Sequence, residues 1–264
     1  MSGIERIAEA FARARADGRR AALMPYMMGC FPDRERSEAI ASAYVDAGAD
    51  LIEFGIPFSD PLADGPVIYE AGTVALRNGA TVHDALAVAG TVADRVPVAV
   101  MCYANPILAR GLERFADELA RLGVAGLIVP DLPLEETEAV ARACEERGIA
   151  LVPLVAPTTT EERMRRIGAA ARGFLYAVSV TGTTGERAAL DGALPAVIAR
   201  ARASTEVPVA VGFGISTPEQ AAAAARAGAD GVIIGTRLVR AAADWPDPAS
   251  AVGALVREFS LALR

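Results

Sequence analysis

The sequence predicts an α/β fold: a TIM (β/α)8 barrel in which residues 1–264 form a single domain with an extra N-terminal helix. The first observation is a set of short apolar runs that alternate with helical patterns. The second is a recurring boundary at which a helix ends, a glycine follows and an apolar run begins. The third is the length of the chain, because eight βα units in 264 residues match the usual size of this barrel. A doubly wound open sheet is the alternative, since a strand count does not show that a sheet closes.

Eight apolar runs are expected to be strands. Their near-continuous hydrophobic character is typical of strands that are buried on both faces of a parallel sheet. Four of them follow the recurring boundary, where a helix ends, a glycine follows and an apolar run begins, as in "DAGADLIEFG" and "RAGADGVIIG". The expected strands lie within 21–28, 46–55, 97–103, 121–130, 146–155, 173–178, 207–213 and 226–235.

Helical patterns occupy the intervals between these strands. Thr81 precedes one helix, and Thr217-Pro218-Glu219 places a proline in the first turn of another. No linker rich in proline and serine divides the chain, which favours one domain. The expected helices are 4–16, 37–47, 66–77, 82–94, 111–121, 134–147, 160–169, 191–203, 217–226 and 248–263.

Composition narrows the possible functions. The formal net charge is -7 and the basic residues are scattered, which argues against a nucleic-acid-binding surface. All 26 basic residues are arginine, so the chain can form neither a Schiff base through a lysine nor a covalent pyridoxal phosphate adduct. A single histidine, His83, argues against a multi-histidine zinc site. Any acid–base chemistry is therefore expected to depend on carboxylates.

The cysteines and the N-terminal residues indicate the cellular compartment in which the protein is expected. Cys30, Cys102 and Cys144 are far apart and form no CxxC pair. The first residues carry charges every few positions and lack the apolar stretch of a secretory signal, and no apolar run approaches the roughly 18 residues that span a bilayer. We therefore expect a cytoplasmic protein with reduced thiols and no structural zinc.

A carboxylate, Glu53, interrupts the apolar run at 51–55. If Glu53 faces the barrel axis, Leu51 and Gly55 share its side, whereas Ile52 and Phe54 face the helices. Such barrels perform catalysis at the carboxyl ends of their strands, and burial raises the pKa of a carboxyl toward the range useful for acid–base work. We interpret Glu53 as catalytic, and the alternative is a structural acid that backbone donors or an arginine satisfy.

A second carboxylate, Asp64, lies on the loop after this strand. Taken alone, "SDP" and "ADGP" are ordinary turn sequences, and Asp64 could instead cap the helix expected at 66–77. Its position beside Glu53 favours a catalytic role. A magnesium site formed by Glu53, Asp60 and Asp64 is a further alternative, although their spacing matches no recognised ligand motif.

Glycine-containing segments follow the last three strands, at 179–187, 212–216 and 234–237. In such barrels the loops after strands 7 and 8 commonly bind phosphate, because glycine lets backbone N–H groups approach an anion at a helix N-terminus. The last two segments together predict a phosphate site without lysine, although glycines also make tight turns. The segment 179–187 is interpreted as a lid over the substrate. Tyr103 and Tyr176, at expected strand ends, either line a pocket or pack in the core.

The motif "IEFGIPFSDPLADGPVI" at 52–68 closely resembles the signature of the tryptophan synthase α subunit family. The resemblance continues in order through "YANPI", "IVPDLP", "APTTT", "VGFGIS" and "GADGVIIGT", and so covers nearly the whole chain. It implies a barrel lyase that cleaves indole-3-glycerol phosphate to indole and glyceraldehyde 3-phosphate. It also implies an α2β2 heterotetramer in which the β subunit carries pyridoxal phosphate, receives the indole through a tunnel and communicates with loops 56–64 and 179–190. No cofactor is expected on this chain.

The resemblance also implies roles for single residues. Glu53 matches the acid–base glutamate, Asp64 the second catalytic carboxylate, and Tyr176 a tyrosine beside the reacting indole. The other substrate-binding residues that it implies are Tyr103, Thr184 and Gly185, the last two in the closing loop, and Phe213, Gly214, Gly235 and Thr236, which include the phosphate site. Two positions differ from the family pattern: many members have arginine where this chain has Val180, and glycine is common where this chain has Cys30.

The implied chemistry agrees with the residue types. Retro-aldol cleavage normally needs a lysine imine or a metal as electron sink, whereas an indole ring protonated at C3 places the positive charge on its own nitrogen. Glu53 would move the proton and help deprotonate the glycerol hydroxyl, and Asp64 would bind the indole N–H. The alternatives are another sugar-phosphate barrel such as an epimerase, a related indole-glycerol-phosphate lyase acting alone, and a non-enzyme that only activates or scaffolds a partner.

Overall fold

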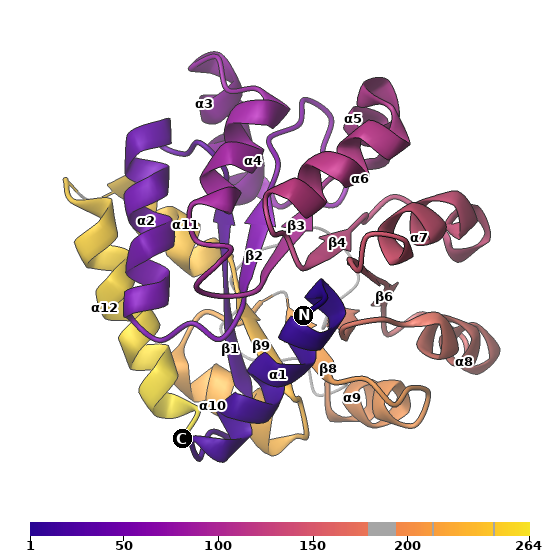
Figure 1. Cartoon of the computed structure of the whole chain (residues 1–264). Helices are drawn as coiled ribbons and strands as arrows, with labels where there is room; N and C mark the ends of the chain where they lie inside the picture. Colours follow the sequence, from indigo (N-terminus) through magenta and orange to yellow (C-terminus); the bar gives the residue numbers. More distant parts are fainter. Residues whose placement is uncertain (179–193, 213, 245) are drawn as a thin grey trace.

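The structure, a computed structural model, describes residues 1–178, 194–212, 214–244 and 246–264. In these ranges, nine strands surround a central axis and the helices form an outer layer (Figure 1). Neighbouring strands are parallel and follow the order β5-β4-β3-β2-β1-β9-β8-β7-β6. The strands are β1 (Ala22–Met28), β2 (Ile52–Gly55), β3 (Val98–Met101), β4 (Gly126–Ile128), β5 (Ala150–Val152), β6 (Leu154–Val155), β7 (Leu175–Val178), β8 (Val209–Gly212) and β9 (Gly231–Ile234).

The two strands at the ends of this order, β5 and β6, belong to one segment of chain, residues 150–155. Pro153 separates them, and proline has no N–H to donate to a neighbouring strand. Since β5 pairs with β4 and β6 pairs with β7, this segment closes the ring of strands. The predicted barrel is confirmed and the open-sheet alternative is wrong. One of the eight expected strands is divided in two at Pro153.

The ten expected helices are present, with ends that differ by a few residues from the prediction, and two short helices, α5 and α11, were not expected. Side-chain caps explain several starts: Thr81 accepts from the N–H of Asp84 at 3.2 Å, and Asp84 accepts from the N–H of Thr81 at 3.1 Å. No helix in the described ranges is long and apolar enough to cross a membrane. The helices are α1 (Gly3–Ala16), α2 (Arg34–Asp46), α3 (Pro66–Arg77), α4 (Val82–Gly90), α5 (Ala104–Arg110), α6 (Leu112–Arg121), α7 (Glu138–Glu145), α8 (Glu161–Ala170), α9 (Leu194–Arg202), α10 (Pro218–Arg226), α11 (Thr236–Asp244) and α12 (Pro248–Ala262).

The N-terminal helix α1 packs across the amino-terminal end of the barrel (Figure 1). Its Ile7 is fully buried and lies against Gly126 and Gly173, where an added Cβ would be 3.3 and 3.1 Å from Ile7 Cδ1. Phe11, one helical turn further, packs beside Phe174 with ring centroids 6.1 Å apart. Gly126 and Gly173 thus leave the space that the Ile7 side chain of α1 fills.

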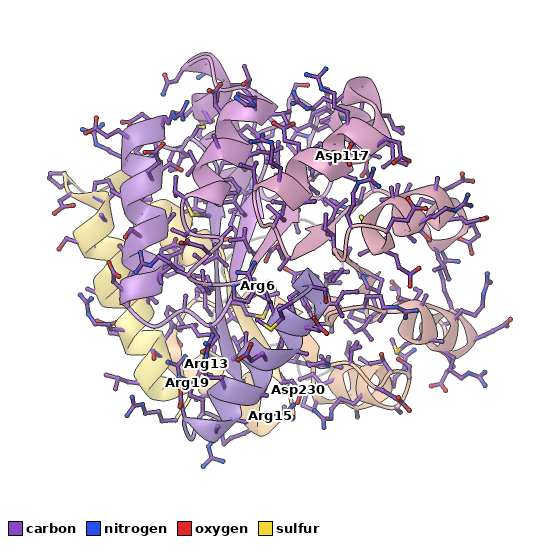
Figure 2. All side chains as sticks on the ribbon, viewed as in Figure 1. Arg6, Arg13, Arg15, Arg19, Asp117 and Asp230 are labelled. Atoms are coloured by element: carbon purple, nitrogen blue, oxygen red, sulfur yellow. The ribbon has the colours of Figure 1, made fainter. Side chains whose placement is uncertain are left out.

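Arginines and acids fasten α1 to the rest of this end (Figure 2). Arg15 pairs with Asp230 at 2.5 Å, and Asp230 also accepts from Arg202 at 2.7 Å and from the N–H of Val209 at 3.0 Å. Arg6 donates to the carbonyl of Gly123 at 2.8 Å. The exposed ion pairs among these contribute less than about 1 kcal/mol each, so buried apolar packing dominates the stability of this end.

Cys30 follows β1 with φ at 59°, in the left-handed region that glycine adopts without steric strain. This backbone accounts for the glycine that the resemblance leads one to expect here. The three cysteines are buried free thiols. Burial raises the pKa of the Cys30 thiol to about 11, so the thiol is un-ionised at neutral pH.

Candidate active site

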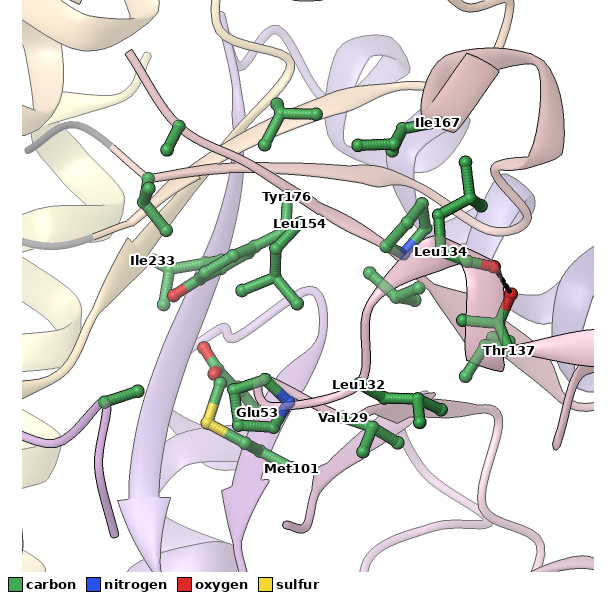
Figure 3. A pocket seen from close by; sticks show the side chains of 18 of the residues that line it. Glu53, Met101, Val129, Leu132, Leu134, Thr137, Leu154, Ile167, Tyr176 and Ile233 are labelled. Carbon is green, nitrogen blue, oxygen red and sulfur yellow. Dashed lines mark hydrogen bonds between the residues drawn. The ribbon is translucent and has the colours of Figure 1, made fainter. Parts of the chain in front are cut away.

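A cavity with a total volume of about 620 Å³ includes the carboxyl ends of the strands and extends outward toward α7 and α8. Glu53 and Tyr176 project into it from opposite sides, with Met101 and Ile233 on its wall (Figure 3). Six of the residues expected at the site line this one cavity: Glu53, Asp64, Tyr176, Gly214, Gly235 and Thr236. Residues that are far apart in the sequence therefore meet at the end of the barrel where catalysis was expected.

Glu53 points inward, as the alternation along the strand predicts. It lies in register with Tyr26 of β1 and Ala99 of β3, and its side chain is 1% exposed. Phe54, one residue later, faces outward, since an added Cβ at Gly29 would meet both its ring and the methyl of Ala85 on α4. The carboxyl group of Glu53 is therefore held in the cavity and shielded from bulk water.

The Glu53 carboxyl is poised to carry a proton. Burial, together with the nearby Asp64 carboxylate, raises its pKa to about 8. Its Oε2 has no hydrogen-bond partner among the described residues. A purely structural acid would be satisfied by a backbone donor or an arginine, whereas this oxygen is available to a ligand.

Asp64 is held by a tyrosine from another βα unit. The hydroxyl of Tyr103 donates to Asp64 Oδ1 at 2.9 Å and accepts from the N–H of Ala63 at 3.0 Å. Phe58, from the same loop, stacks on the Tyr103 ring with centroids 5.3 Å apart. Partial burial raises the pKa of Asp64 to about 6, and the hydrogen bond from Tyr103 opposes that rise.

Asp64 does not occupy the N-cap position of the next helix. Helix α3 begins after Gly65, which is its N-cap, and the carboxylate of Asp64 accepts from Tyr103 instead. Tyr103 lies behind Asp64 and does not line the cavity, so it reaches the site through that carboxylate.

Two glycines make room for two buried tyrosines. An added Cβ at Gly55 would lie 2.1 Å from the Tyr26 hydroxyl, and one at Gly212 would lie 2.3 Å from the Tyr176 hydroxyl. Burial raises the pKa of both tyrosines well above the ordinary value, so both remain protonated donors. Tyr26 lines the cavity but was missed from the sequence, where it is one aromatic residue in an apolar run. The sequence holds no signal for it, because the register of Tyr26 with Glu53 appears only when the two strands pair.

The expected phosphate-binding end of the site has two features that favour an anion: a glycine with positive φ and a helix N-terminus. Gly214 has φ at 81°, a conformation that side-chain-bearing residues rarely adopt. Gly235 and Thr236 lie at the start of α11, and both line the cavity. The first N–H groups of a helix lack partners within the helix, so this end offers donors and a partial positive charge to an anion.

Some expected residues are not placed at this site. Thr184, Gly185 and Phe213, as well as Val180, lie outside the described residues. Asp60 is exposed and its carboxylate bonds to the hydroxyl of Ser59 at 2.5 Å. Among the residues that the structure describes, no three histidine, cysteine or acidic side chains form a group that could hold a metal ion. The carboxylates of Glu53, Asp60 and Asp64 are accordingly not gathered into such a group.

Comparison with protein families gives one match over most of the chain. A family model described as "Tryptophan synthase alpha chain" matches residues 11–259. The tryptophan synthase alpha chain of Prochlorococcus marinus (strain MIT 9313) is 46% identical over 257 residues, which cover 97% of this chain and 91% of that protein. The alpha chain of Methanosarcina mazei is 42% identical over 254 residues, or 96% of this chain and 93% of that protein.

Solved structures show the same relationship in three dimensions. Mycobacterium tuberculosis tryptophan synthase has a chain that superposes with a TM-score of 0.92 at 40% identity, covering 98% of both chains. A chain of the tryptophan synthase α2β2 complex of Pyrococcus furiosus superposes with a TM-score of 0.85 at 34% identity, covering 90% of this chain and 97% of that one.

Proposed function

The chain belongs to the family of tryptophan synthase alpha chains, and on this premise we propose that Glu53 and Asp64 carry the acid–base steps of its reaction. The enzyme is a lyase of tryptophan biosynthesis that cleaves indole-3-glycerol phosphate to indole and glyceraldehyde 3-phosphate, and the indole passes to a beta subunit. In this family pyridoxal phosphate belongs to the beta chain and the alpha chain carries no cofactor. The observation that carries the proposal is the buried Glu53 carboxyl, with an unpartnered oxygen facing the cavity.

Glu53 moves the proton in this proposal. With a pKa of about 8 it is protonated at neutral pH and donates its proton to C3 of the indole ring, whose nitrogen takes the positive charge. The Glu53 carboxylate then removes the proton of the adjacent glycerol hydroxyl. The bond between C3 and the glycerol carbon breaks, its electrons restore the aromatic ring, and the hydroxyl carbon becomes the aldehyde. Glu53 recovers its proton in the cycle.

Asp64 stabilises the indole cation that forms after C3 is protonated and before the carbon–carbon bond breaks. Its pKa of about 6 leaves it ionised at neutral pH, so it accepts a hydrogen bond from the indole N–H as that group becomes positive. Tyr103 fixes the direction of the carboxylate through its 2.9 Å hydrogen bond. Tyr103 is thus a positioning residue, whereas Tyr176 lines the space of the ring itself.

The phosphate group is proposed to bind at the other end of the cavity. Gly214 allows close approach of the backbone, and the N-terminus of α11 at Gly235 and Thr236 supplies N–H donors. Phe213, Thr184 and Gly185 remain proposed contacts.

The beta subunit is proposed to cover the catalytic end of the barrel in an α2β2 heterotetramer. Three large apolar side chains are exposed there: Leu62 on the loop after β2 is 84% exposed, Tyr69 in the first turn of α3 is 47% exposed, and Leu108 on α5 is 65% exposed. Exposed apolar side chains that share one rim are typical of a surface that a partner covers. The three free thiols support the cytoplasm as the location.

The test is indole release from indole-3-glycerol phosphate by purified wild-type and Glu53→Gln protein, with and without a beta subunit. The variant is expected to lose activity by about 10³-fold while still binding substrate, because the amide keeps the shape but carries no transferable proton. Near-normal turnover would refute the role of Glu53. Indole release without any beta subunit separates a lyase from a protein that only activates its partner.

A further inference from the structure

The catalytic cavity continues beyond the ring of strands. Leu154 lies in register with Tyr176 and faces the inside of the barrel, whereas Leu151 and Pro153 have the opposite parity and face the outer helices. All three residues line the same cavity. The cavity therefore extends past the segment 150–155, at the place where Pro153 interrupts the strand.

The space outside this segment lies between α7 and α8, which stand apart on either side of β6 in Figure 1. Figure 3 shows Leu134, Thr137 and Ile167 on the side of the cavity remote from Glu53. We call this space the outer limb and define it by six residues: Thr137, Ala141, Leu151, Pro153, Ile167 and Ala170.

Three of the polar groups at the outer limb already have partners. The hydroxyl of Thr137 donates to the carbonyl of Leu134 at 2.8 Å. Arg163 makes two hydrogen bonds to Glu135, at 2.8 and 2.9 Å, and Arg172 donates to the carbonyl of Ala171 at 3.1 Å. The Glu145 carboxylate, on the same face of α7 as Thr137 and Ala141, also lines this part of the cavity, and the other side chains of this wall are aliphatic.

A wall of this kind selects a class of ligand. Apolar walls accept neutral apolar molecules, whereas an anion there would lose its hydration, would face the Glu145 carboxylate and would have to compete with Glu135 for Arg163. A phosphate-bearing substrate is therefore disfavoured in the outer limb, and a neutral aromatic ring is favoured.

We propose that the outer limb is a second binding site for a neutral planar aromatic molecule of the class of indole. The proposal rests on the proposed function, because indole is the neutral aromatic product released beside Glu53. The outer limb and the space beside Glu53 belong to the same cavity, so the second site adjoins the place where this product is released.

The test uses indole itself with the full-length chain. Crystals soaked in indole are expected to show one ring beside Glu53 and a second between α7 and α8, and titration in solution is expected to saturate above one indole per chain. Indole density confined to the space beside Glu53 would overturn the proposal.

Two variants close the outer limb from opposite walls. Ala141→Phe on α7 and Ala170→Phe on α8 each place a ring in it, and each is expected to weaken binding at the second site by about tenfold or more. Ala139→Phe and Ala169→Phe are the matched controls, because these alanines lie on the same two helices and do not line the cavity. Wild-type binding by both filling variants would contradict the proposal.

Glu53→Gln separates this proposal from the catalytic one. It is expected to lose cleavage and to keep indole in the outer limb. If it keeps cleavage, the proposed role of Glu53 fails while the second site stands. If it binds no indole between α7 and α8, the second site fails.

Discussion

The hydroxyl of Tyr103 lies 2.9 Å from Asp64 Oδ1 and donates a hydrogen bond to it. Tyr103 follows β3 at the N-cap of α5, whereas Asp64 lies on the loop after β2. The bond thus joins two βα units and sets the direction of a carboxylate in the active site.

Replacing Tyr103 by phenylalanine is expected to raise the pKa of Asp64 further above its ordinary value. The hydrogen bond favours the charged carboxylate, so its loss favours the protonated form. The acidic limb of the kcat profile should move to higher pH, and kcat at neutral pH should fall by about tenfold, as for a lost hydrogen bond to a charged group. Tyr69→Phe, at an exposed tyrosine on α3, is the control. An unmoved acidic limb would show that Tyr103 does not tune Asp64.

The activity of the wild-type enzyme is expected to be bell-shaped in pH. Catalysis needs Asp64 ionised and Glu53 protonated, and their pKa values are about 6 and about 8. Activity should therefore fall as pH drops below about 6, where Asp64 gains a proton, and as pH rises above about 8, where Glu53 loses one. Steady-state indole release across this range measures both limbs. Full activity well above the upper limb would mean that protonated Glu53 is not required.

Glu53→Gln is expected to stabilise the fold at alkaline pH. Because burial raises the pKa of Glu53 from 4.5 to about 8, the folded state binds more protons than the unfolded state between these values, and stability falls as pH rises through this window. The glutamine has no such penalty. Its stability advantage should grow from pH near 4.5 to pH near 8, by a few kcal/mol at most, and then level off. Urea unfolding of both proteins at several pH values checks this, and a difference independent of pH would refute it.

Gly55→Ala is expected to disturb the site through Tyr26. The new methyl would lie 2.1 Å from the Tyr26 hydroxyl, so the ring must move, at a cost of about 1–3 kcal/mol in stability. Activity should fall as well, because Tyr26 shares the cavity with Glu53. Adding Tyr26→Phe removes the nearest clashing atom and should restore part of the stability in thermal unfolding.

The matched control for this change is Gly253→Ala on α12. Its new methyl would meet nothing closer than 3.6 Å, and alanine is the better helix former. This variant should be at least as stable as wild type. If Gly55→Ala is equally harmless, Tyr26 is not confined as the structure indicates.

Leu62→Asp is expected to weaken binding of the beta subunit by about tenfold or more, because an interface loses a large apolar contact and gains a charge. Leu62 is 84% exposed at the catalytic rim, so the free chain should keep its stability. Leu261→Asp, at a 65% exposed leucine on α12, is the control for a change of the same kind elsewhere. Titration with the purified beta subunit measures the affinity, and equal binding by both variants would place the interface elsewhere.

The sequence predicts the barrel well because its signals are local. Four of the boundaries between a helix and the next strand repeat a helix end, a glycine and an apolar run, and caps such as Thr81 mark helix starts. Glu53 was identifiable because a charge within a buried strand stands out. Helix α11 was missed because it begins at Thr236, within the glycine-containing segment 234–237 that was interpreted as a phosphate site, and the seven-residue helix α5 was not predicted.

The contacts between units are what the sequence does not show. Nothing in the local pattern at 103 indicates that its hydroxyl reaches Asp64, since the two residues meet only when neighbouring strands align. Tyr26 is similar, because an aromatic residue in an apolar strand has the same pattern whether it packs in the core or lines a cavity. The path past Pro153 likewise depends on how far α7 and α8 stand apart.

The way α1 seals the base has a consequence for how this protein can be altered. Gly126 and Gly173 leave a hollow that Ile7 occupies, so the plug comes from a segment that precedes the first βα unit. The helix that closes the amino-terminal end of the barrel and the residues that carry the chemistry therefore lie in separate segments of the chain. New loops can be grafted onto the carboxyl ends of the strands without any change to α1. Truncation of α1, in contrast, would expose the amino-terminal end of the barrel to water although no active-site residue had changed.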